Sequence, residues 1–284
     1  MTEPGRTLNQ LRGEIDRLDD ALVDLLVRRA RVAAELAPLK AGAPLLRPGR
    51  EAEILRRLAA AAGPGFDRAA LVRIWREIMS AALRRQGPFS VAVSAPAGGP
   101  ACWALARDQY GAGTPMVAAA GPARAIAAVA AGAAEVAVVP FPSEDDADPW
   151  WPRLMVEGEA APRVIARLPV AAALAPPDGC TDGLAVAPMA PEPSGEDRSW
   201  LGIETAAETG RDRVARALAG AGFESVRVQA GAGRGGGLYL ADLAGFVEPG
   251  ATGLAHLAAS LGHALVRVVV IGAYAVPLPE EPIP

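Results

Sequence analysis

Apolar positions in the first forty residues follow a heptad spacing that predicts one long helix. They recur at alternating steps of three and four residues, at Leu8, Leu11, Ile15, Leu18, Leu22, Leu25, Val32, Leu36 and Leu39. The remaining position of this seam is occupied by Arg29. An apolar seam packs against other helices, and a guanidinium within it is costly to bury unless an anion meets it. Either a carboxylate within the bundle or an anionic ligand should therefore meet Arg29.

The same pattern predicts a module of three helices over residues 1–88. The first helix is expected to start at Thr7 and to end near Lys40, a length of about 50 Å at 1.5 Å per residue. The second and third are expected over 48–62 and from Asp67 to residue 85 or 86, with breaks at 63–65 and 87–88. A first helix of this length exceeds what a small monomeric domain can cover, so the pattern favours a bundle with a partner chain.

After residue 88 the pattern alternates between strands and helices, which predicts an α/β lobe over 89–197 with parallel strands. Strands are expected at 90–93, 116–119, 134–139 and 184–187, and helices up to Tyr110 and over 122–132. The last segment, 198–284, has the order of a ferredoxin-like βαββαβ α+β domain. Its strands are expected near 200–205, 224–230, 237–243 and 265–274, and its helices near 211–221 and 251–261.

Composition restricts the class of protein further. The chain is 51% hydrophobic and 5% aromatic, and its longest apolar runs are interrupted by charges or glycines and are too short to span a membrane. The N-terminus shows no signal-peptide pattern, so a cytoplasmic location is expected. Cys102 and Cys180 have neither metal-ligand spacing nor a disulfide framework. We therefore expect no metal and no cofactor.

Charge is distributed unevenly along the chain. Residues 1–88 hold 16 Lys and Arg against 11 Asp and Glu, a net charge of +5, whereas the remainder has a net charge of −9. A basic helical module on an acidic protein suits a small anionic substrate. Nucleic acid is disfavoured as a partner because acidic residues interrupt the basic ones and no aromatic platform accompanies them.

Spacing along the first helix groups its cations. Arg29 and Lys40 are eleven residues apart, so they share a face and lie about 16 Å apart along the axis, where together they could hold a small dianion. Arg12 lies about 25 Å from Arg29 and cannot reach the same ligand on its own chain. In an antiparallel dimer it could reach the site of the partner.

Further candidates flank the second and third helices. Arg50 and Glu51 open the second helix, whose N-terminus attracts anions, and the amide of Gln86 could donate a hydrogen bond at the end of the third. For Arg12, Arg50 and Gln86 the alternative is a solvated surface side chain. For Arg29 the alternative is a buried ion pair.

Three motifs carry a resemblance to a known family. The stretches LRGEIDRLDDALVDLLVRRARVAAELAPLK, RPGREAEIL and IWREIMSAALRRQ resemble the all-helical class of chorismate mutase over residues 7–86. The resemblance implies an interlocked helical homodimer that converts chorismate to prephenate in phenylalanine and tyrosine biosynthesis. It places Arg29, Lys40 and Gln86 at catalytic positions and Arg12, Arg50 and Glu51 at substrate-binding positions, with Arg12 serving the partner protomer's site.

Two positions depart from that family pattern, where Arg47 replaces an acid and Ala82 replaces a serine. Both are substrate-positioning places in the family, so affinity is affected more than the reaction. The rearrangement is unimolecular and needs no acid, base, nucleophile or metal. It needs a substrate held in a compact shape and a cation near the breaking ether bond.

The order of the whole chain resembles the bifunctional chorismate mutase–prephenate dehydratase, with an ACT-type domain at 198–284. The dehydratase's Thr-Arg-Phe motif aligns with Thr181-Asp182-Gly183, and Phe141-Pro142-Ser143-Glu144 replaces its Glu-Asn-Ser step after Pro140. In the ACT-type segment, 210–212 and 229–231 replace the phenylalanine-binding motifs. We therefore expect an inactive dehydratase-like lobe. A working bifunctional enzyme and a non-catalytic protein that binds an aromatic-pathway ligand or a partner enzyme remain alternatives.

Overall fold

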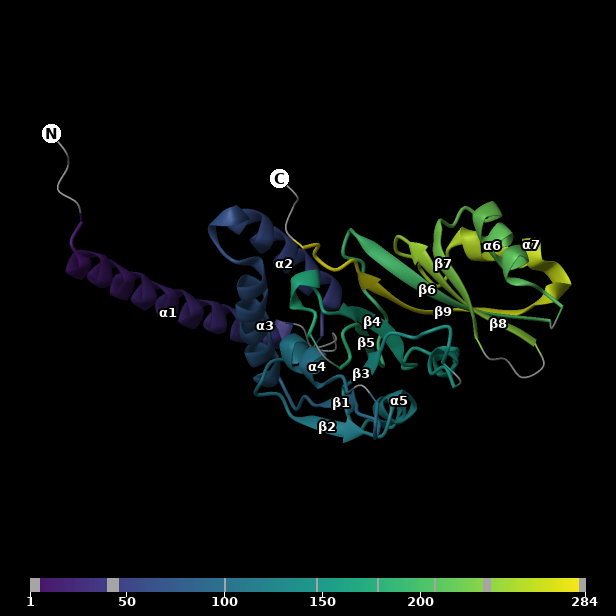
Figure 1. Ribbon diagram of the computed structural model, residues 1–284, viewed down its shortest axis with the longest axis horizontal. Helices are drawn as coiled ribbons and strands as arrows, with labels where there is room; N and C mark the ends of the chain where they lie inside the picture. The colour runs from purple at the N-terminus through teal and green to yellow at the C-terminus, as the bar shows by residue number, and fades with distance from the viewer. Residues whose placement is uncertain are drawn as a thin grey trace.

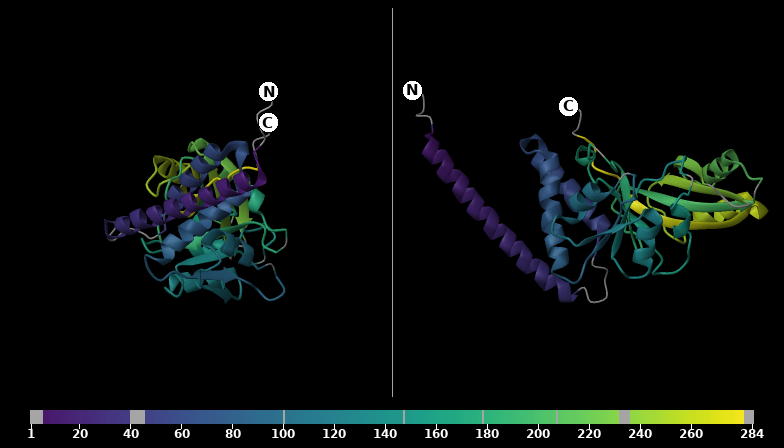
Figure 2. Two further views of the ribbon diagram at one scale, coloured as in Figure 1. Left: turned by 90° about the vertical axis from the view of Figure 1, so that its left-hand side faces the viewer. Right: turned by 60° about the horizontal axis from the view of Figure 1, so that its bottom comes forward.

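The computed structural model describes residues 6–39, 46–99, 101–146, 148–177, 179–206, 208–231 and 236–280. Three helices come first, α1 (Leu8–Leu39), α2 (Pro48–Ala62) and α3 (Arg68–Arg84). The α1 helix projects away from the rest of the chain, whereas α2 and α3 pack against the sheet region (Figures 1 and 2). The side chain of Asp67 caps α3 by accepting a hydrogen bond from the backbone N–H of Ala70, and Pro48 opens α2. The three expected helices are confirmed to within two residues at each end.

The apolar seam of α1 is exposed in the single chain. Its members stand 40–62% exposed, namely Leu8, Leu11, Ile15, Leu18, Leu22, Leu25 and Val32. A helix that is isolated in water depends on tertiary packing of its apolar face for most of its stability. The seam is therefore an unpartnered face of the molecule.

The middle of the chain forms a mixed sheet, not a purely parallel one. Its elements are β1 (Val91–Ser94), α4 (Trp103–Tyr110), β2 (Met116–Ala119), α5 (Pro122–Ala130), β3 (Val136–Pro140), β4 (Arg163–Leu168) and β5 (Gly183–Ala187). Strand β1 pairs in parallel with β2 and β3, but β5 is antiparallel to both β3 and β4. The parallel prediction is correct for three strands and wrong for β5. Strand β4 was not predicted from the sequence.

The C-terminal segment has the expected βαββαβ order. It consists of β6 (Asp197–Ala206), α6 (Arg211–Gly220), β7 (Ser225–Gly231), β8 (Gly236–Ala244), α7 (Thr252–Leu261) and β9 (Leu265–Ala275). These four strands are antiparallel neighbours in the order β9-β6-β8-β7. Helices α6 and α7 pack side by side on the strands around a core that includes Leu201, Val214, Leu218 and Leu257 (Figure 1).

The two sheet regions join into one. Strand β4 pairs in parallel with β9 at Val164 and Gly272, so the described residues form a nine-stranded sheet in the order β2-β1-β3-β5-β4-β9-β6-β8-β7. A buried aromatic cluster covers this junction, where Trp200 contacts Phe141, Trp150 and Tyr274. The chain thus consists of a helical module followed by a large mixed α/β region. No helix among the described residues is long and apolar enough to cross a membrane.

Candidate functional site

A groove between α1 and α3 brings together two of the residues singled out from the sequence. The two helices converge near their C-terminal ends (Figure 2), and a groove of about 380 Å³ lies between them. Arg29 of α1 borders it from one side, and Gln86, just after α3, borders it from the other. The rest of the lining is Leu26, Ala30, Ala33, Ala34, Ile78, Ala81, Ala82 and Arg85. The groove therefore combines an apolar floor with a small number of hydrogen-bond donors, as small-molecule sites do.

Arg29 is half-buried and makes no ion pair with any residue that the structure describes. Of the two explanations for a cation in the seam, an intramolecular ion pair is therefore not found among the described residues. The amide nitrogen of Gln86 donates to the carbonyl oxygen of Ala82 at 3.2 Å, one turn back. Ala82 lies in the wall of the groove. Because it stands where the family pattern has a serine, this part of the wall is apolar and carries no hydroxyl.

The described residues add neither of the other two candidate cations, Arg12 and Lys40, to this groove. Arg12 is exposed on α1 and does not line the groove. Lys40 lies outside the described residues. The site expected from the sequence is thus represented in the described chain by Arg29 and Gln86.

Arg50 and Glu51 lie at the start of α2, outside the groove. Arg50 is exposed, and its Nη1 donates to Glu53 Oε2 at 2.7 Å. An exposed ion pair of this kind contributes only about 0–1 kcal/mol. The pair with Glu53 is therefore too weak to prevent the Arg50 guanidinium from binding another anion.

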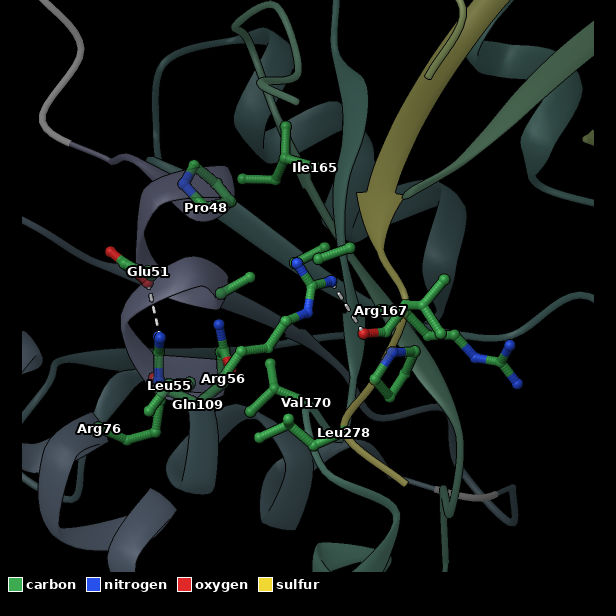
Figure 3. A pocket seen from close by; sticks show the side chains of 15 residues that line it. Pro48, Glu51, Leu55, Arg56, Arg76, Gln109, Ile165, Arg167, Val170 and Leu278 are labelled. Carbon is green, nitrogen blue, oxygen red and sulfur yellow. Dashed lines mark hydrogen bonds and ion pairs between the residues drawn. The ribbon is translucent and has the colours of Figure 1, made fainter. Parts of the chain in front are cut away.

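Glu51 is instead committed to a buried partner. Its carboxylate accepts a hydrogen bond from Arg76 Nη1 at 2.6 Å, and Arg76 is 3% exposed (Figure 3). The Nε of Arg76 donates to the backbone oxygen of Gln109 at 2.8 Å, which ties α3 to α4. Burial raises the pKa of the neighbouring Tyr110, although the positive charge of Arg76 opposes the shift. Arg76 thus connects α2, α3 and α4, and Glu51 supplies its counter-charge.

A second, much smaller cavity lies beside this pair, between α2 and the sheet. Its volume is about 30 Å³, and Glu51, Arg56, Arg76 and Arg167 contribute to its lining (Figure 3). This volume fits a water molecule and is too small for an amino acid or a substrate with a ring. The groove between α1 and α3 is the better candidate for a ligand site.

The position of the dehydratase motif carries an ion pair in this chain. Asp182 accepts two hydrogen bonds from Arg167, at 3.1 Å from Nε and 2.8 Å from Nη2. The guanidinium of Arg167 also lies 4.7 Å from the ring centroid of Phe141. The two replaced motifs therefore contact each other through Arg167, in a part of the sheet that is held by packing and charge pairing.

Three arginines were missed by the sequence reasoning. Arg85 lines the groove, Arg76 is buried beside Glu51, and Arg56 contacts the segments before β6 and after β9. For Arg85 a signal was available, because it continues the helical face of Ile78 and Ala82. For Arg76 and Arg56 no local signal exists, since their partners are distant in sequence. Among the described residues no group of three or more His, Cys, Asp or Glu side chains is arranged to hold a metal ion.

Comparison with known proteins identifies the helical module. The chorismate mutase type II family matches residues 11–87. A curated 4-amino-4-deoxychorismate mutase of Streptomyces venezuelae is 36% identical over 83 residues, which are 28% of this chain and 80% of that protein. Bifunctional chorismate mutase/prephenate dehydratases of Stutzerimonas stutzeri and Aquifex aeolicus are 37% and 38% identical over 98 and 95 residues, or 32% and 31% of this chain.

The chain belongs to the chorismate mutase type II family through its helical module. The matched segment spans only 27% and 26% of the two bifunctional relatives. Two solved structures align with 66% of this chain, each at a TM-score of 0.46. One is described as GqqA, a novel type of quorum quenching acylases; it is 19% identical, and the alignment covers 96% of that chain. The other is a prephenate dehydratase from Arthrobacter aurescens in complex with L-Phe; it is 15% identical, and the alignment covers 89% of that chain.

Proposed function

We propose that the helical module catalyses the rearrangement of chorismate to prephenate, and that the groove between α1 and α3 is part of its active site. The observation that carries this proposal is the groove itself, to which α1 contributes Arg29 and the segment just after α3 contributes Gln86, within a chorismate mutase type II domain. Chorismate is a dicarboxylate with a ring, so a cationic groove with an apolar floor suits it.

The proposed mechanism is conformational and electrostatic. The groove holds chorismate in the compact shape from which the new carbon–carbon bond forms as the ether bond breaks. A cation or amide donor beside the ether oxygen stabilises the charge that develops there in the transition state. Gln86 is proposed to supply this donor in the described chain, Arg29 to hold a carboxylate of the substrate, and Lys40 to complete the clamp.

The roles of the α2 residues differ from one another in this proposal. Arg50 is a candidate substrate-binding residue, because its pair with Glu53 is exposed and weak. Glu51 is proposed to act by position, since its carboxylate is engaged by buried Arg76. Both act at the start of α2, where the helix dipole also favours an anion.

The active unit is proposed to be a homodimer. The exposed seam of α1 needs an apolar partner, and a second copy of the same helix offers a matching seam. Arg12, about 25 Å along α1 from Arg29, would then serve the partner's site. We propose the division into a mutase domain (1–88), an inactive dehydratase-like lobe (89–197) and an ACT-like regulatory domain (198–284).

The proposal is tested by incubating the purified full-length protein with chorismate and separating the products by chromatography. Formation of prephenate without phenylpyruvate supports a mutase with an inactive dehydratase-like lobe. Formation of phenylpyruvate would instead show a working bifunctional enzyme, and unchanged chorismate would leave a binding or regulatory protein.

A second candidate substrate is 4-amino-4-deoxychorismate. The Streptomyces venezuelae relative, 80% of whose length is covered by the match, is named for a mutase that acts on that compound. The two compounds differ only where a hydroxyl is replaced by an amine. A parallel assay decides between them: a ratio of kcat/KM values that favours the amino compound would reassign the substrate and keep the reaction class.

A further inference from the structure

The polar part of the groove is made by very few residues. Of the ten that line it, only Arg29, Arg85 and Gln86 have side chains that donate hydrogen bonds. Two of these three are guanidinium groups, one from each helix. An anionic ligand bound on the apolar floor would therefore meet a positive charge on both sides.

Arg85 belongs to the face of α3 that forms the groove wall. Ile78, Ala82 and Arg85 follow one another at steps of four and three, which places them within about 60° around the helix axis. Gln86 lies about 80° from Ile78, further toward the edge of this face. Arg85 is thus closer to the centre of the wall than Gln86, the residue singled out from the sequence.

The neighbouring arginine points elsewhere. Arg84 donates from Nη1 to Thr114 Oγ1 at 3.1 Å, on the side of the sheet region. Arg85, in contrast, makes no ion pair or side-chain hydrogen bond with the rest of the described chain, and the same holds for Arg29. Two like charges that border one groove repel each other, and a ligand with two negative charges relieves that repulsion.

We propose that Arg85 is a specificity-determining residue that binds one carboxylate of the substrate, while Arg29 binds the other. The inference rests on the proposed function and deepens it, because it assigns the groove to ring compounds with two carboxylates over those with one. The competing explanation is that Arg85, as the residue that ends α3, only interacts with the helix dipole and with water.

The test measures the affinity of the full-length protein for chorismate and for its two monomethyl esters, from KM and inhibition constants in steady-state kinetics, and by calorimetry wherever chorismate is not turned over. Wild-type protein is compared with Arg85→Ala, Arg85→Lys and the control Arg57→Ala, which removes the same charge from an exposed site on α2. For Arg85→Ala we expect chorismate affinity to fall by about ten- to a hundredfold, the range for a charge-assisted hydrogen bond. Arg85→Lys should retain part of the affinity, and Arg57→Ala all of it.

The two esters show which carboxylate of chorismate each arginine binds. In wild-type protein each ester should bind more weakly than chorismate. In Arg85→Ala one of the two esters should bind as well as chorismate, because its missing charge is the one that Arg85 met. Equal losses in Arg85→Ala and Arg57→Ala, or chorismate affinity within twofold of wild type, would overturn the inference. A wild-type protein that binds chorismate through Arg85 but releases no prephenate would contradict the proposed function alone.

Discussion

At the scale of single residues, Arg29 shows how much one misplaced charge in a pattern can indicate. It interrupts an otherwise apolar seam, and the structure places it at the edge of a groove without an ion pair to a described residue. The chemistry could be read from sequence because the helical period alone assigns Arg29 to the seam. The opposite wall of the groove could not be predicted from sequence, because the position of α3 beside α1 depends on tertiary packing.

We expect Arg29→Ala to lower kcat/KM for chorismate by about 10²-fold or more, because the substrate is no longer held in the orientation that reacts. The oligomeric state and the melting temperature should stay unchanged, because Arg29 makes no ion pair or side-chain hydrogen bond with a described residue. Steady-state kinetics and light scattering check the two parts. The control is Arg28→Ala, an exposed neighbour outside the groove. Near-full activity of Arg29→Ala would remove the groove from the mechanism.

The Glu51–Arg76 pair gives a prediction about stability. Removal of the carboxylate by Glu51→Ala leaves a guanidinium that is 3% exposed without a counter-charge. We expect the free energy of unfolding to fall by about 3 kcal/mol, as for other broken buried pairs. Urea denaturation followed by circular dichroism measures this change.

The matched control breaks an exposed pair on the same helix. Glu53→Ala removes the partner of Arg50 and should change the free energy of unfolding by less than about 1 kcal/mol. The double variant Glu51→Ala/Arg76→Met should recover part of the loss, because no buried charge then remains unpaired. Equal effects of Glu51→Ala and Glu53→Ala would show that burial of Arg76 does not matter to stability.

At the scale of elements, patterning predicted helices better than strands. The bounds of α2 were predicted to the residue because Pro48 opens the helix and a Gly-Pro-Gly sequence ends it. Strand β4 was missed for a physical reason. It is largely buried and lies between two strands, so it shows no apolar–polar alternation, and Arg163 and Arg167 at intermediate exposure interrupt its apolar run.

The apolar seam of α1 is exposed in the single chain, and its proposed partner is the same seam of a second copy. We expect the double variant Leu18→Glu/Leu25→Glu to dissociate the proposed dimer, because both leucines lie at the centre of the seam and would bring charge into an apolar contact. Analytical ultracentrifugation over a range of concentrations measures the shift toward monomer.

The control places the same charge on the other side of the helix. Arg31 lies roughly 140° from Leu18 around the axis and is exposed, so Arg31→Glu should leave the dimer intact. Kinetics add a second readout, since the monomeric variant should lose activity if Arg12 serves the partner's site. A wild-type protein that sediments as a monomer at all concentrations would contradict the dimer.

At the scale of the whole molecule, the sequence predicted separate units and the structure joins them. The βαββαβ order was predicted from the alternation of elements, but the pairing of β4 with β9 depends on residues more than a hundred positions apart. The helical module is joined to the rest through α3, where Arg76 contacts α4, and through α2. Arg47 forms an ion pair with Glu192, and an added Cβ at Gly49 would lie 2.6 Å from the backbone oxygen of Pro193.

Arg56 makes the most extensive of these contacts among the described residues. Its Nη1 donates to the backbone oxygen and to Oγ of Ser194, at 2.7 and 3.1 Å, and its Nη2 donates to the backbone oxygens of Glu196 and Val276, at 2.8 and 3.3 Å. The side chain is 18% exposed. One arginine of α2 thus connects the segment before β6 with the segment after β9.

We expect Arg56→Ala to lower the free energy of unfolding by about 2–3 kcal/mol, because several charge-assisted hydrogen bonds are lost while water can reach only some of the carbonyls left behind. Hydrogen exchange at a single backbone amide tests this contact more specifically than the free energy of unfolding does. The backbone N–H of Val276 donates to the same Glu196 oxygen that accepts from Arg56, at 2.9 Å, so its hydrogen exchange should accelerate in the variant. Arg57→Ala, on the exposed side of α2, should change neither quantity. If exchange of Val276 stays at the wild-type rate while stability falls, Arg56 stabilises α2 alone, and the helical module is not coupled to the sheet through this residue.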